Sequence, residues 1–150
     1  MFTIKSISVT GTGFVGLVTA LCFAEKGFRA YAITHDEKKA AAINQGKTPF
    51  YEPKLAPLLK KALKKKRIRC ITNVKSAVFD SEVTFIAMGT PSLHDGSIDL
   101  SFIAQSCEEI GRAISKKKEY NLVVVKSTVV PGTTDGLVKA RLEKYSRKKA

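Results

Sequence analysis

Residues 4–21 read IKSISVTGTGFVGLVTAL, and this stretch decides the fold. Its first six residues predict a short strand. Gly11, Gly13 and Gly16 follow in the spacing G-x-G-x-x-G, and apolar residues then recur at helical spacing up to Gly27, a good helix C-cap. A glycine turn between a strand and a helix is typical of the phosphate-binding turn of a βαβ unit.

The three glycines have different predicted tasks. The first allows the tight turn, the second lets the backbone approach a pyrophosphate, and the third lets the helix pack closely on the strand. The exposed backbone N–H groups and the positive end of the helix dipole then face the negative phosphates. The predicted dinucleotide site comprises Gly11, Thr12, Gly13, Phe14, Val15 and Gly16.

The rest of the chain alternates strand-like and helix-like segments, which predicts parallel strands joined by right-handed crossovers. Further strands are predicted at 28–33, 68–72, 83–88 and 122–126, and further helices at 37–45, 55–63, 74–79, 100–115 and 135–145. The predicted fold is one domain over 1–150: a Rossmann-type, doubly wound α/β sheet of about five strands, in the order 3-2-1-4-5. Such sheets commonly have six strands, so we expect the sixth to be missing and a sheet edge with apolar surface to be exposed.

The composition excludes several classes of protein. Hydrophobic residues make up 44% of the chain and aromatic residues 8%, which is enough for a buried core. No apolar run reaches the ~20 residues that cross a bilayer, and the N-terminus does not resemble a secretion signal, so we expect a cytoplasmic protein. The three cysteines show no zinc-binding spacing, so no metal is expected, and Cys22 is predicted to be a small core residue.

The formal net charge of +13 is large and is concentrated in runs at 60–69, 116–118 and 147–149. It predicts either a footprint for nucleic acid or another polyanion, or a set of solvated helix faces. No RNA-binding motif, helix-turn-helix signal or aromatic interleaving accompanies the charge. Nucleic-acid binding is therefore the less favoured interpretation.

Four longer stretches, taken together, resemble a known family. They are GTGFVGLVTALCFAEKGF, INQGKTPFYEPKLAPLL, FIAMGTPSLHDGSIDLSFI and VVVKSTVVPGTTDGL. Their order and spacing are similar to those of the N-terminal NAD-binding domain of the UDP-glucose/GDP-mannose dehydrogenases, and most like UDP-glucose 6-dehydrogenases. The resemblance implies an NAD-dependent oxidation of the sugar C6 hydroxyl to a carboxylate, through intermediates held on a cysteine.

The resemblance also implies roles for single residues. Thr90, beside Gly89 after the fourth predicted strand, matches a threonine that contacts the cofactor. Thr128 matches a threonine near the nicotinamide that helps to position catalytic water. Lys39 matches a basic residue near the adenosine ribose. Glu52 belongs to the matching YEP motif, and no chemical role is assigned to it.

Two departures from the family pattern affect the interpretation. The segments with the family's catalytic cysteine, lysine and glutamate have no counterpart here, so we expect a cofactor domain of a larger enzyme that is inactive by itself. The full-length enzyme is expected to bind a UDP-sugar and to be a homodimer, whereas this part is expected to be a monomer. A stand-alone dinucleotide-binding module is the alternative.

The second departure lies at the end of the second predicted strand, where Thr34 replaces the family's ribose-binding Asp. Asp36, 20 residues after Gly16, could bind the ribose instead, but it is also a natural helix N-cap. His35, Lys38 and Lys39 could meet a 2′-phosphate. The family resemblance favours NAD as the cofactor, and NADP remains an alternative.

Overall fold

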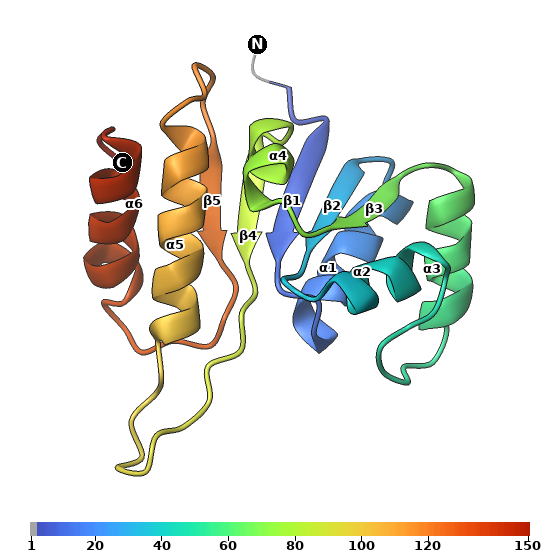
Figure 1. Cartoon of the computed structure of the whole chain (residues 1–150), viewed down its shortest axis with the longest axis horizontal. Coiled ribbons are helices and arrows are strands. Elements are labelled where there is room, and N and C mark those ends of the chain that lie inside the picture. Colours follow the sequence, from blue (N-terminus) through green and yellow to red (C-terminus); the bar gives the residue numbers. More distant parts are fainter. Residues whose placement is uncertain (1–2) are drawn as a thin grey trace.

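A computed structural model describes residues 3–150 as a five-stranded parallel sheet with the strand order β3-β2-β1-β4-β5 (Figure 1). The predicted fold and strand order are therefore confirmed. The strands are β1 (Ser6–Thr10), β2 (Arg29–Ile33), β3 (Ile68–Ile71), β4 (Val83–Ile86) and β5 (Leu122–Val125). The order reverses between β1 and β4, which is the place where such sheets bind ligands.

Helices cover both faces of the sheet and enclose two separate hydrophobic cores. One core joins the sheet to α1 (Phe14–Glu25), α2 (Glu37–Asn44) and α3 (Leu55–Lys64). The other joins it to α4 (Val74–Phe79), α5 (Ser101–Ile114) and α6 (Lys139–Ser146). In the part of the chain that the structure describes, no helix has the length and apolar character required to span a bilayer.

Most element boundaries differ from the predicted ones by one or two residues, and at two of them the structure shows a distinct local feature. The first strand was expected at 4–9 but begins at Ser6, where the Glu82 carboxylate accepts hydrogen bonds from the backbone N–H groups of Lys5 and Ser6 at 3.0 and 2.8 Å. The last helix was expected at 135–145 but consists of a π-helical turn, Thr134–Val138, followed by α6.

The two edge strands of the sheet, β3 and β5, differ in how well they are covered. At β3, the Asn44 side chain both donates to the Cys70 carbonyl and accepts from the Cys70 N–H, at 2.7 and 2.9 Å, so the outward-facing backbone groups of Cys70 are satisfied. At β5, Leu122 is 41% exposed. The expected exposed edge is therefore found at β5, the last strand in the sheet order.

Cys22 is exposed, so its predicted place in the core was wrong. The helix α1 is apolar on nearly every side, and the sequence pattern does not distinguish its faces. Leu17, Ala20, Leu21 and Ala24 meet the sheet, whereas Cys22 lies on an apolar surface with Phe14, Val15 and Val18.

Candidate cofactor-binding site

The glycine turn between β1 and α1 is held closely against β2 and β4. The N–H of Gly11 donates to the Ile33 carbonyl at 3.0 Å, and Gly11 adopts a left-handed φ of +92°. A Cβ on Gly11 would lie 2.5 Å from the Ala87 carbonyl oxygen, and one on Gly16 would lie 2.0 Å from the carbonyl oxygen of Gly11. The fold itself therefore requires glycine at both positions.

Gly13 is different, because the fold gives no reason for a glycine there. Its φ is −77°, and a Cβ on it would meet no atom within 4 Å. Gly13 is also the N-cap of α1, and no side chain caps that helix end. Open space beside uncapped backbone N–H groups suits an approaching anion.

Thr12 supplies a second sign of a ligand. Its side chain is only 3% exposed, and within residues 3–150 its hydroxyl is the one buried side-chain polar atom without a hydrogen-bond partner. Buried hydroxyls are normally paired, so this one needs an external partner. Together with Gly13 and the free end of α1, it fits a pyrophosphate group.

A cavity of about 340 Å³ extends from this turn along the carboxyl ends of β1, β2 and β4. Thr10 at the end of β1 lines it, together with Gly11 and Thr12 of the glycine turn. Its remaining lining residues are Ile33, Thr34, His35, Asp36, Lys39, Val74, Met88 and Glu109. The predicted residues Thr34, Asp36 and Lys39 are thus brought together with the start of the turn. Phe14 and Val15 are 59% and 51% exposed and line a separate apolar hollow, so any contact from them to this cavity comes from the backbone.

The polar groups at the end of β2 are largely engaged with one another. Asp36 is the N-cap of α2, as predicted, and its Oδ1 accepts from the Lys39 N–H at 3.0 Å. The Thr34 hydroxyl accepts from the Asp36 N–H at 3.3 Å. One Asp36 oxygen therefore stabilises the helix, and the Thr34 O–H remains available to donate to a ligand.

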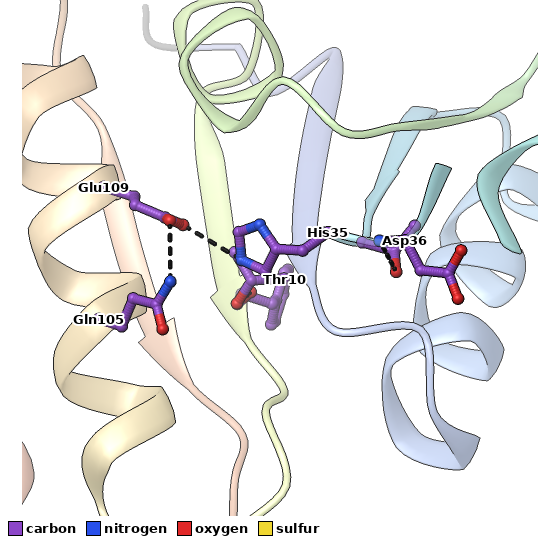
Figure 2. A network of polar contacts seen from close by, with 7 residues as sticks. Thr10, His35, Asp36, Gln105 and Glu109 are labelled. Atoms are coloured by element: carbon purple, nitrogen blue, oxygen red, sulfur yellow. Dashed lines mark hydrogen bonds and ion pairs between the residues drawn. The ribbon is translucent and has the colours of Figure 1, made fainter. Parts of the chain in front are cut away.

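A polar contact between side chains connects the end of β2 with α5 on the other side of the cavity. His35 Nε2 lies 3.4 Å from Glu109 Oε2, and the amide of Gln105 donates to Glu109 Oε1 at 3.3 Å. Figure 2 shows the side chains of His35 and Glu109 pointing toward one another. Sequence reasoning missed Glu109, since nothing in its local pattern separates it from the other polar residues of α5.

The predicted residues after β4 and β5 also lie together. The Thr90 hydroxyl donates to the Thr128 carbonyl at 3.0 Å, and the Ser127 hydroxyl donates to the Met88 carbonyl at 2.7 Å. A Cβ on Gly89 would meet no atom within 4 Å. These loops lie beyond the cavity at the same edge of the sheet, and Ser127, which sequence reasoning did not single out, holds them together.

The cysteines are poorly placed for nucleophilic chemistry. Burial raises the pKa of the Cys70 thiol to about 11, and burial raises the pKa of the Cys107 thiol to about 11 as well. Neither these two nor Cys22 lines the cavity. In residues 3–150 no group of three His, Cys, Asp or Glu side chains is arranged to hold a metal ion.

Comparison with known proteins agrees with this geometry. Residues 5–150 match the NAD binding domain of the UDP-glucose/GDP-mannose dehydrogenase family. A GDP-mannose 6-dehydrogenase from Pseudomonas aeruginosa is 44% identical over 144 residues, 96% of this chain and 33% of that protein. A UDP-glucose 6-dehydrogenase from Haloferax volcanii is 38% identical over 143 residues, 95% of this chain and 33% of that protein.

Solved structures give the same result. A UDP-glucose dehydrogenase from Pyrobaculum islandicum superimposes with a TM-score of 0.94 at 37% identity, over 98% of this chain and 34% of that one. The ternary complex of GDP-mannose dehydrogenase from Pseudomonas aeruginosa superimposes with a TM-score of 0.93 at 43% identity, over 95% of this chain and 33% of that one. The chain thus spans about a third of the length of these relatives. It belongs to the UDP-glucose/GDP-mannose dehydrogenase family and corresponds to its NAD-binding domain.

Proposed function

We propose that this chain binds NAD in the 340 Å³ cavity and serves the oxidation of a nucleotide-sugar C6 hydroxyl to a carboxylate. The observation that carries the proposal is the glycine turn, with its open Gly13, its unpaired Thr12 hydroxyl and the uncapped end of α1. These three features have no structural purpose of their own, and all of them favour a bound pyrophosphate.

The other site residues divide along the cofactor. We assign Thr34, Asp36 and Lys39 to the adenosine ribose, because they line the cavity at the end of β2. Gly89, Thr90 and Thr128 are assigned to the nicotinamide end, where NAD would accept a hydride from the sugar. The Thr90 hydroxyl holds the Thr128 carbonyl, which fixes the backbone of that loop and leaves the exposed Thr128 hydroxyl to position water.

The substrate and the assembly are proposed from the relatives. GDP-mannose and UDP-glucose 6-dehydrogenases both match the chain, so we propose one of these two nucleotide sugars as the substrate. The described site holds no reactive thiolate, and the covalent part of the reaction would need residues outside this chain. A cytoplasmic, homodimeric enzyme is proposed on the same family basis, with the 150-residue chain itself a monomer.

Calorimetric titration with NAD at two salt concentrations tests the binding. We expect one NAD per chain, with an affinity that changes little between low and moderate salt. The reason is that most of the expected contacts to the pyrophosphate come from backbone N–H groups inside a cavity, not from exposed charged side chains. Binding that fell steeply with salt would favour a general polyanion surface instead. No binding by the folded chain would overturn the proposal. A stand-alone dinucleotide-binding module would also bind NAD, but a longer protein containing it would not oxidise a nucleotide sugar.

One observation favours NADP as a second candidate cofactor. At the end of β2 a hydroxyl, Thr34, occupies the place where a carboxylate would repel a 2′-phosphate, and Lys39 and His35 line the same cavity. Titration of Thr34→Asp with both cofactors separates the two possibilities. If NADP is used, Thr34→Asp should weaken NADP binding by about tenfold or more while NAD binding is retained. Equal affinities of the variant and the parent for NADP would eliminate this candidate.

A further inference from the structure

A second, larger cavity lies outside the cofactor site, on the face of the sheet that α4, α5 and α6 cover. Its volume is about 670 Å³, and it shares no lining residue with the cofactor cavity. No carboxylate lines it. Its basic lining residues are Lys75, Arg112, Lys116, Lys144, Arg147 and Lys148.

The positive charge in this cavity is largely uncompensated. Arg112 pairs with Glu108 at 2.6 Å, but in the described part of the chain Lys75, Lys116, Lys144 and Arg147 have no carboxylate within 4.0 Å. Like charges gathered in one hollow repel one another, and the folded protein carries that cost. An anion bound among them would remove it.

Helix dipoles explain only part of the arrangement. Arg112 and Lys144 lie in the last turns of α5 and α6, where positive charge is favourable. Lys75, however, lies in the first turn of α4, where positive charge opposes the dipole. Its presence in the same hollow therefore calls for another reason.

Two of the basic side chains in the hollow make cation–π contacts with one aromatic ring. The Tyr145 ring has the Arg112 guanidinium 5.3 Å from its centroid and the Lys144 ammonium 5.5 Å away. Such contacts restrict flexible basic side chains and so reduce the ordering cost of binding. The hollow thus has partly preorganised donors in addition to net charge.

The shape of the charge distribution favours a small ligand over nucleic acid. The basic run at 60–69 belongs to α3, β3 and the turn between them, whereas the hollow is lined by residues of α4, α5 and α6 and of the segments that follow α5 and α6. Figure 1 shows α3 and α6 at opposite ends of the molecule. The strand order places β3 and β5 at opposite edges of the sheet, so the two basic regions do not form one track. We propose that the hollow is a second anion site, which binds the phosphates of a compact, multiply phosphorylated molecule such as a nucleoside triphosphate.

Inorganic tripolyphosphate is the probe for this site, added to the 150-residue chain at 0.15 M salt. We expect saturable binding by calorimetry, and NMR shifts of backbone amides at Lys75, Arg112, Lys116 and Arg147. The triple variant Lys116→Gln, Lys144→Gln, Arg147→Gln should bind about tenfold or more weakly. All three side chains are exposed, so folding should be unaffected.

A matched control removes the same number of charges elsewhere. The variant Lys60→Gln, Lys64→Gln, Lys65→Gln changes exposed lysines at α3 and should bind tripolyphosphate within about twofold of the parent. Equal weakening by both triple variants would mean diffuse charge and would overturn the site. Shifts confined to residues 11–16 would place the anion on the glycine turn and would also overturn it. Tighter binding of a DNA duplex, weakened equally by both variants, would establish a nucleic-acid surface instead.

Discussion

Replacing Gly13 by alanine should separate cofactor binding from folding. The added Cβ would have no atom within 4 Å, and the φ of −77° suits alanine. The same carbon on Gly11 would lie 2.5 Å from the Ala87 carbonyl oxygen, at a φ of +92°. Gly11→Ala is therefore a matched control, with the same methyl group two residues away and the opposite expected effect on folding.

The expected magnitudes follow from the backbone of each position. At Gly13, alanine stabilises by about 0.4–1 kcal/mol through the entropy of the unfolded chain, and its poorer capping of α1 offsets a similar amount. The free energy of unfolding should therefore stay within about 0.5 kcal/mol of the parent. At Gly11, the left-handed conformation alone costs an alanine about 1–2 kcal/mol, and the carbonyl contact raises the total to about 3 kcal/mol.

Thermal unfolding and NAD titration together measure both effects. For a chain of this length each kcal/mol shifts Tm by about 2–4 °C, so Gly11→Ala should unfold about 6–12 °C below the parent. Gly13→Ala should keep the parent Tm. Its NAD affinity should nevertheless fall about 100-fold, equivalent to about 2.7 kcal/mol, because the methyl group occupies the space where the pyrophosphate approaches.

Two results would contradict this reasoning. If folded Gly13→Ala binds NAD as tightly as the parent, the pyrophosphate does not approach this turn and the site is misassigned. If Gly13→Ala is destabilised as much as Gly11→Ala, the open space beside Gly13 does not exist. The comparison therefore tests the ligand and the geometry separately.

Three other substitutions test the scaffold. Partial burial raises the pKa of the Glu82 carboxyl, but the hydrogen bonds that it accepts from Ser6 and Lys5 outweigh this effect and leave the pKa lowered. The ionised Glu82 carboxylate should thus stabilise the fold above about pH 4.3, and this stabilisation should be lost as the pH falls through the lower pKa of the folded state. Glu82→Gln should lower the free energy of unfolding in urea by about 2 kcal/mol at pH 7, and the stabilities of variant and parent should converge in acid. Gly111→Ala should lower stability by about 1–3 kcal/mol, against the usual gain in a helix, because its Cβ would lie 2.8 Å from that of Tyr145. Asn44→Ala should lose about 2 kcal/mol in the same assay, since both Cys70 backbone groups lose their partner.

The fold was predictable because its signals are local. The helix predicted at 74–79 is found as Val74–Phe79, where Asn73 accepts from the Ser76 N–H as an N-cap. The strand order followed from alternation of strands and helices, which leaves few right-handed arrangements. The N-cap role of Asp36 was equally local, since it depends on a residue three positions away.

Burial on α1 was not predictable in the same way. An amphipathic helix shows its buried face in its sequence, but α1 is apolar almost all round. Only the packing against the sheet decides that Leu21 is buried and that its neighbour Cys22 is exposed. The π-helical turn at Thr134–Val138 also escaped prediction, because its hydrogen bonds join residues five positions apart instead of four, as from the Val138 N–H to the Thr133 carbonyl.

The site was predictable only as far as it follows the chain. The glycine turn and the end of β2 are continuous segments, whereas Glu109 reaches His35 from 74 positions away. The basic residues show the same limit more strongly. In sequence the three runs look alike, but 116–118 and 147–149 contribute to a hollow with Lys75 and Arg112, and 60–69 does not. The net charge of +13 is therefore not one footprint, and its meaning depends on which charges the fold brings together.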